Sequence, residues 1–285
     1  MLSLHTNIAA LSAQNSISKT QSNLSTSQTR LSTGYRINSA MDDAAGLQIA
    51  SRLKAQTSGM TVAMRNTANS TSMLQTAEGA LDEVSNMLIR MKDLATQAAD
   101  ASSTDKDKTA MQSEYDALGL ELANVLNNTT FGGASLLVGG TIEGEMTFQI
   151  GASSSEKMVI DLEDDVTGMD ADVSAVSVNY TNAGAAAGTE LTANANATIG
   201  SLEDALASVN KVRSGLGAAA NRLEHVYNNL ANISTNTKAA TGQIMDVDFA
   251  SESANMTSNQ MLLQASTAML KQANSQSSMV MSLLQ

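Results

Sequence analysis

The sequence predicts a mainly α protein: a long antiparallel coiled-coil helical rod formed by the N- and C-terminal halves, with a small β-hairpin and loop insert in the middle. Three observations carry this prediction. The 285 residues include no proline, so no ring interrupts a long helix. Aromatic residues make up only 2% of the chain, too few for a thick globular core. Three long segments repeat apolar residues at intervals of three and four.

These patterns divide the chain into five successive parts. We expect an N-terminal core helix, two rod helices, a hairpin with a variable loop region, a third rod helix and a C-terminal core helix, at residues 1–43, 44–130, 131–200, 201–243 and 244–285.

The two terminal segments combine a thin apolar stripe with an almost uncharged polar remainder. Ser, Thr, Asn and Gln account for 21 of the first 40 residues. Such a helix alone buries too little apolar area to offset roughly 1 to 2 kcal/mol of backbone entropy per residue, so we expect both ends to be disordered in a monomer. Packing against each other and against neighbouring copies would order them. The stripe residues predicted to act in assembly are Leu4, Ile8, Leu11, Ile17, Leu24, Leu31, Phe249, Met256, Leu263, Leu270 and Leu284.

The rod is predicted from three heptad seams. The first runs through residues 74–98 and extends back to Met60, which gives a helix of roughly 57 Å at 1.5 Å per residue. The second covers residues 111–125 and stops before Gly132 and Gly133. The third runs from Leu202 to Ile233. Three long seams favour a coiled helical bundle.

The insert between the second and third seams has a different pattern. Residues 146–150 and 158–162 predict two short strands around a turn. Residues 173–200 are mostly small and polar, so we expect a solvent-facing loop or a very small outer module there. The acidic run at 163–165 lacks the regular alternation of a calcium loop and is interpreted as a solvated rim.

Composition excludes several classes of function. A net charge of −12 argues against nucleic acid, and no apolar run is long enough to span a membrane. The first ten residues lack a basic cluster and a long apolar stretch, so we expect no cleavable secretion signal. With no cysteine and only His5 and His225, we expect no metal and no cofactor. No nucleophile, base and metal constellation can be assembled, so we expect no enzyme.

Several long motifs resemble bacterial flagellin. They are LSTGYRINSAMDDAAGL at 31–47, LGAAANRL at 216–223, DVDFASE at 246–252, AN at 273–274 and SLLQ at 282–285. The resemblance covers about 1–162 and 200–285. The middle is far shorter than in large flagellins, so we expect no substantial outer domain.

The resemblance implies a structural subunit that polymerises into the extracellular helical flagellar filament for bacterial swimming. It implies export through the flagellar type III apparatus, with a cytoplasmic secretion chaperone at the C-terminal segment. The implied partners are further copies of the chain, the hook-associated and cap proteins, and the vertebrate Toll-like receptor that senses flagellin. The family's receptor motif in the rod maps onto Arg90, Leu94 and Glu114, and Ile89 stands where a Gln is usual in receptor-activating members.

Several residues have a structural interpretation beside the functional one. Asp42 and Asp43 are adjacent and point apart on a helix, so we expect them to fix the joint between the terminal helix and the rod, with Arg36 or Arg52 as counterion. Arg90 is interpreted equally as a receptor or subunit contact and as an exposed arginine paired with an acid. Leu94 falls one position outside the first seam, which predicts a surface apolar anchor.

Two other functions share part of this pattern. A hook–filament junction protein has the same terminal signature but makes only a short ring. A cytoplasmic chemoreceptor-like signalling coiled coil would also be rich in heptads, alanine and acidic residues. The uncharged ends and the insert containing Gly132 and Gly133 argue against the signalling protein.

Overall fold

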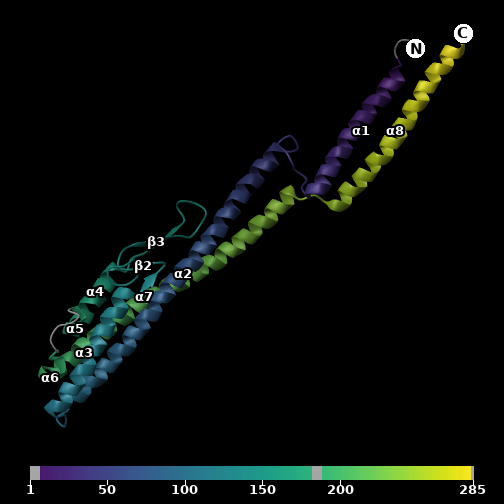
Figure 1. The fold of residues 1–285 in the computed structure, drawn as a ribbon. Helices are drawn as coiled ribbons and strands as arrows, with labels where there is room; N and C mark the ends of the chain where they lie inside the picture. Colours follow the sequence, from purple (N-terminus) through teal and green to yellow (C-terminus); the bar gives the residue numbers. More distant parts are fainter. Residues whose placement is uncertain (1–6, 182–187, 284–285) are drawn as a thin grey trace. The chain divides into compact units, whose positions relative to one another are not determined.

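A computed structural model of the chain describes residues 7–181 and 188–283 (Figure 1). The chain forms two compact units. The terminal unit comprises Met1–Thr57 with Thr235–Gln285, and the central unit comprises Ser58–Ser234. Among the described helices, none is both long and apolar enough to cross a membrane.

The prediction of a mainly α chain with a small hairpin insert is confirmed. The helices are α1 (Ile8–Thr33), α2 (Ala44–Ala99), α3 (Asp105–Asn128), α4 (Glu163–Ser174), α5 (Val178–Thr181), α6 (Glu190–Ala193), α7 (Ala195–Met245) and α8 (Phe249–Leu283). The strands form two antiparallel pairs, β1 (Thr130–Phe131) with β2 (Ala134–Ser135) and β3 (Met146–Gln149) with β4 (Lys157–Ile160).

The core of the central unit lies between α2, α3 and α7. Leu74, Leu81 and Leu88 of the first predicted seam are fully buried, as is Leu202 at the start of the third. Ile233 differs from the prediction: it is 38% exposed, while the neighbouring Ser234 is buried.

Ion pairs show how α2 and α7 are aligned. Asp82 pairs with Arg213 at 2.8 Å, and Lys92 pairs with Glu203 at 2.9 Å. From the first pair to the second, the residue number rises by ten on α2 and falls by ten on α7. The two helices therefore run antiparallel with a constant register. This arrangement brings residues remote in sequence together to close the rod.

The insert is more helical than the sequence suggested. Residues 163–165 form the first turn of α4, where their carboxylates are favoured by the positive end of the helix dipole. Val173, Val176 and Leu191 are buried in the main core, so the expectation of a solvent-facing loop at 173–200 is wrong for the described residues.

Side chains of α3 hold this insert in place. The Tyr115 hydroxyl donates to the Val176 carbonyl at 2.8 Å, and the Leu191 N–H donates to Gln112 Oε1 at 2.7 Å. Burial raises the pKa of Tyr115 far above its ordinary value, so the phenol stays neutral and keeps its proton to donate. The described segments that contain Val176 and Leu191 therefore belong to the packed rod.

Candidate assembly site on the terminal helices

In the terminal unit, α1 and α8 lie side by side and antiparallel (Figure 1). Buried and half-buried residues recur at intervals of three and four on both helices, as in a coiled coil. We call these residues the inner seam: Ala10, Ala13, Ile17, Thr20, Leu24, Ser27 and Leu31 on α1, with Met256, Asn259, Leu263, Ser266, Leu270 and Ala273 on α8. Small and polar residues alternate with apolar ones, so the apolar contact is thin.

A short antiparallel connection joins the end of α1 to the segment before α8. Gly34 has φ 75°, a conformation that L side chains rarely adopt, and its N–H donates to the Arg30 carbonyl at 2.9 Å to end the helix. The Gly34 carbonyl then accepts from the Val247 N–H at 3.0 Å, and the Arg36 N–H donates to the Met245 carbonyl at 2.6 Å. These bonds fix the relative register of the two chain segments.

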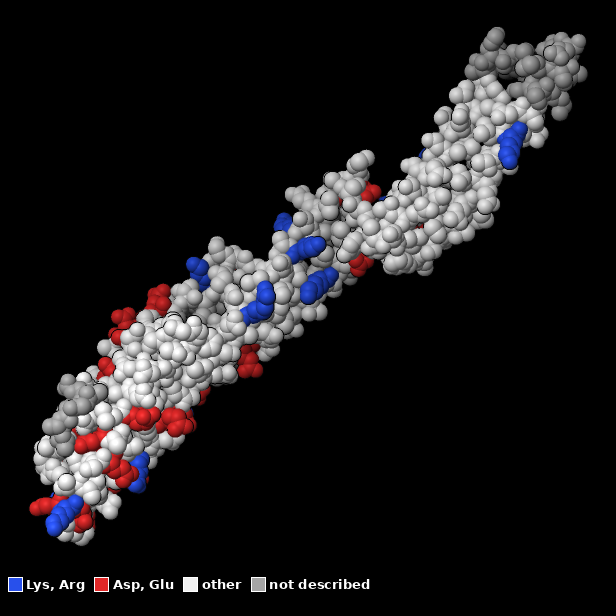
Figure 2. Space-filling model, viewed as in Figure 1, with Lys and Arg blue, Asp and Glu red and all other residues white. Residues whose placement is uncertain are grey.

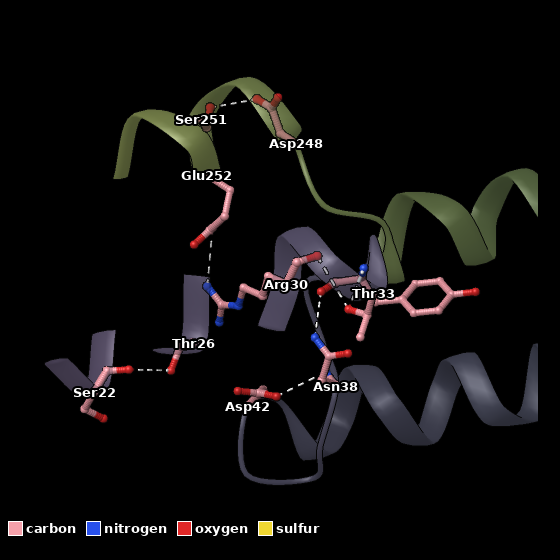
Figure 3. A network of polar contacts seen from close by, with 10 residues as sticks. Ser22, Thr26, Arg30, Thr33, Asn38, Asp42, Asp248, Ser251 and Glu252 are labelled. Carbon is pink, nitrogen blue, oxygen red and sulfur yellow. Dashed lines mark hydrogen bonds and ion pairs between the residues drawn. The ribbon is translucent and has the colours of Figure 1, made fainter. Parts of the chain in front are cut away.

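The carboxylate of Asp42 organises the loop between α1 and α2 (Figure 3). It accepts from the Ser39 N–H at 2.9 Å and from the Asn38 N–H at 3.1 Å. These backbone donors, Ser39 first, hold the pKa of Asp42 below its ordinary value. Asp43 accepts from the Gly46 N–H at 2.8 Å in the first turn of α2. Both aspartates therefore bind backbone N–H groups, Asp42 in the loop between α1 and α2 and Asp43 at the start of α2.

The predicted counterions are wrong. Among the ion pairs of the described residues, neither Arg36 nor Arg52 meets Asp42 or Asp43. The Arg36 guanidinium instead donates to the Ile244 carbonyl at 2.9 Å, and Arg52 is exposed on α2. Backbone N–H groups, together with the Ser39 hydroxyl at Asp42, satisfy the two carboxylates without either arginine.

Another aspartate begins α8. Asp248 accepts from the Ala250 N–H at 3.0 Å and from the Ser251 hydroxyl at 2.7 Å, and these bonds, Ser251 first, lower its pKa. Glu252, one turn into the helix, lies opposite Arg30 of α1 (Figure 3). The end of α1 and the start of α8 are thus joined by backbone bonds and by one ion pair.

A second set of apolar residues points away from the inner seam. On α8, Met261 is 60% exposed, Leu262 52% and Met269 68%. At 100° per residue these three lie within about 100° of arc, and the centre of that arc is about 130° around α8 from Leu263 and Leu270. On α1, Ile8 and Leu11 are also exposed and outside the seam. We call these five residues the outward face.

The surroundings of the outward face carry few charges. Lys19 and Arg30 are the charged residues of α1, and Glu252 and Lys271 are those of α8. Figure 2 shows this helix pair as a pale surface with few coloured side chains. Covering such a surface with another protein removes apolar area from water and desolvates few charges. The chemistry of the terminal unit therefore suits protein association.

Comparison with known proteins identifies the family. Residues 4–141 match the bacterial flagellin N-terminal helical region, and residues 199–284 match the bacterial flagellin C-terminal helical region. The chain is 38% identical to flagellin of Bacillus subtilis over 299 residues, which cover 98% of each chain.

The chain belongs to the bacterial flagellin family.

Other relatives agree with this flagellin assignment. Flagellin of Halalkalibacterium halodurans is 40% identical over 257 residues, 90% of this chain and 89% of that protein. A solved Vibrio parahaemolyticus structure assigned to the flagellar hook-associated proteins covers 72% of this chain with a TM-score of 0.54, and at 18% identity it shows a shared fold alone. The unmatched residues 142–198 of this flagellin contain β3, β4 and α4 to α6.

Membership of the flagellin family makes this chain a structural filament protein rather than an enzyme. Within the described part of the chain, no group of three or more His, Asp or Glu side chains is placed to hold a metal ion.

The structure separates the predicted assembly residues of this flagellin into different environments. Ile17, Leu24, Leu31, Met256, Leu263 and Leu270 lie in the inner seam, Ile8 and Leu11 lie on the outward face, and Phe249 is 57% exposed at the start of α8. Leu4 and Leu284 lie outside the described residues. Sequence reasoning missed Met261, Leu262 and Met269, although a second apolar repeat of seven, from Leu262 to Met269, was present in the sequence.

The rod residues predicted as a receptor or subunit contact are only partly accessible in this flagellin. Arg90 and Glu114 pair at 2.7 Å, with exposed side chains that bridge α2 and α3. Leu94 is 3% exposed, so the expectation that it is a surface anchor is wrong. Because α2 packs against both α3 and α7, its buried arc is wider than one heptad seam and includes Leu94.

Proposed function

We propose that this chain polymerises into the extracellular helical filament that propels a swimming bacterium, and that the outward face is a contact between neighbouring copies. The second part of the proposal rests on one observation: α8 has apolar residues on two sides, centred about 130° apart around the helix, and α1 covers only one of these sides. Leu263 and Leu270 are half-buried in the inner seam, whereas Leu262 and Met269 are more than half exposed. A further copy of the chain would cover the exposed side.

The mechanism of assembly is geometric. The contact is heterologous, because the outward face meets a different surface of the next copy. When the rotation between copies does not close a ring, repetition of a heterologous contact produces an open helix. The inner seam then holds α1 on α8 within each copy. In this scheme residues 1–43 and 244–285 form the core of the filament, and 44–130 with 201–243 form the rod around it.

The same scheme assigns a role to the joint. Asp42, Asp43 and Asp248 hold the turns that lead into α2 and α8 through backbone N–H groups. These bonds connect the helices that make the filament core to the helices of the rod. We propose that the joint transmits load between these two layers when the filament turns.

Charge substitution on the outward face tests the proposal. We expect Leu262→Asp with Met269→Asp to prevent polymerisation of purified protein, because an unpaired carboxylate would be buried at each contact. Gln264→Asp is the matched control, since Gln264 is exposed on the flank of the same helix and outside both apolar sides. Sedimentation and electron microscopy measure polymer, and urea unfolding checks that the central unit is intact. Normal filaments from the double variant would refute the assigned face.

A further inference from the structure

The chain contains 17 methionines and no cysteine, so thioethers are its only sulfur groups. Several are shielded in the central unit: Met91 and Met169 are fully buried, and Met60, Met111, Met146 and Met158 are at most 8% exposed. Three described methionines are largely open to solvent: Met41 at 96%, Met261 at 60% and Met269 at 68%. A soluble oxidant would therefore reach these three sulfur atoms before those of the core.

Two of the three exposed methionines share one location. Met261 and Met269 are eight residues apart on α8, which places them about 80° from each other around the helix and on the outward face. Met41 instead lies in the loop between α1 and α2. The outward face thus has two accessible thioethers among its five residues.

We propose that Met261 and Met269 are oxidation sites at which a peroxide switches off self-association. This inference rests on the proposed function, because it requires the outward face to be buried between copies. A lone pair of the thioether sulfur attacks one peroxide oxygen, the O–O bond breaks, and the sulfur becomes a sulfoxide. The sulfur loses two electrons. Hydrogen peroxide is reduced to water, and an organic hydroperoxide is reduced to the corresponding alcohol, with protons exchanged through solvent.

The sulfoxide changes the chemistry of the contact. A flexible apolar side chain becomes a polar one with a strong hydrogen-bond acceptor. The neighbouring outward residue Leu262 offers no side-chain donor, whereas Met269 shares a groove with Ser12, Ser16 and Ser266, so the cost of covering the sulfoxide is the desolvation of its oxygen. Two such groups per contact are expected to raise the critical concentration for assembly by about tenfold or more.

The order of events decides the outcome. In free protein both thioethers are exposed and react readily. In the polymer, the contact between copies covers the two thioethers. Assembled copies are therefore protected from the oxidant. The switch therefore acts on unassembled subunits and spares existing polymer, and a methionine sulfoxide reductase would reverse it.

The experiment compares hydrogen peroxide treatment before and after polymerisation. Peptide mass mapping measures the sulfoxide at Met41, Met261 and Met269, and sedimentation measures the critical concentration. We expect treated monomer to show about a tenfold higher critical concentration. We expect treated polymer to be oxidised several-fold more slowly at Met261 and Met269 than monomer is. A variant carrying Met261→Leu and Met269→Leu should lose most of this sensitivity, whereas Met41→Leu should remain as sensitive as wild type.

Three results would overturn the inference: unchanged assembly of fully oxidised wild type, equal inhibition of the double leucine variant, or equal oxidation rates in monomer and polymer at both positions. The rate comparison uses wild-type protein, so it decides the matter even if the leucine variant assembles poorly. Failure of the proposed function is distinguishable, because untreated wild type would then not polymerise, or the Leu262→Asp and Met269→Asp variant would polymerise normally.

Discussion

Arg30, in the last turn of α1, lies 3.7 Å from Glu252, in the first turn of α8. The Glu252 side chain is only 10% exposed, and Arg30 Nε is buried without a hydrogen-bond partner in the described structure. The positive Arg30 lies at the C-terminal end of α1 and the negative Glu252 at the N-terminal end of α8, and the helix dipoles favour both charges. The pair is therefore a polar contact within an otherwise nearly uncharged helix pair.

Removing one partner of this pair should weaken assembly. Glu252→Gln removes the ion pair of the half-buried Arg30 and leaves only its weaker attraction to Asp42, and we expect a cost of about 1 to 2 kcal/mol after allowance for partial exposure and the long distance. This corresponds to roughly a 5- to 30-fold higher critical concentration. Sedimentation measures it. Lys211→Gln, which breaks an exposed pair with Asp165, is the control and should change little.

The joint should loosen in acid. Asp42 and Asp248 have pKa values lowered in the folded state by donated hydrogen bonds, so their stabilisation is present above the unfolded pKa of about 4. It is lost as the pH falls through the lower folded value. We expect amide protection of Asn38 and Ser39, corrected for intrinsic exchange, to fall below about pH 4. Protection at Leu88 is the internal reference; parallel loss at both places would argue against a local effect.

Adjacent residues of α2 should differ sharply in their effect on the rod. Leu88 is fully buried and Ile89 is 48% exposed. We expect Leu88→Ala to lower the free energy of unfolding of the central unit by about 2 to 5 kcal/mol, through lost burial and a cavity. Ile89→Ala should change it by about 0.5 kcal/mol or less. Urea unfolding followed by circular dichroism measures both, and similar values would contradict the packing described.

The insert should depend on the Tyr115 hydroxyl. Tyr115→Phe removes the donor to the Val176 carbonyl and leaves that acceptor buried without its partner. We expect the central unit to lose about 1 to 2 kcal/mol of stability. Tyr227→Phe on α7 is the matched control, because Tyr227 is 41% exposed. A loss in the control as large as that of Tyr115→Phe would show that the hydrogen bond is not the cause.

Much of the rod could be predicted because its seams are regular. Residues from Leu74 to Ala98 are buried at the positions that the heptad repeat predicts. Leu94 was misplaced because a single seam describes a helix with one neighbour, whereas α2 has two. The helix α4 was missed because its first turn is acidic, although Val166, Met169, Val173 and Val176 repeat at intervals of three and four and are all buried.

The candidate site was less predictable. The inner seam and the outward face are both apolar repeats on the same helix, and spacing alone does not tell which of them faces α1. The loop geometry could not be predicted either. The carboxylates of Asp42 and Asp43 bind backbone N–H groups, and a sequence shows side-chain charges more readily than backbone donors. For this reason the sequence predicted arginine partners for the two carboxylates, whereas the structure has backbone N–H groups as their partners.

The constant alignment of α2 with α7 limits how the rod can change in length. One residue inserted between Asp82 and Lys92 would rotate the following part of α2 by about 100° and would direct its apolar positions away from the core. Seven residues added to both helices would preserve each pairing and lengthen the rod by about 10 Å. Insertions and deletions that survive in this region should therefore occur as matched heptads in two distant parts of the gene.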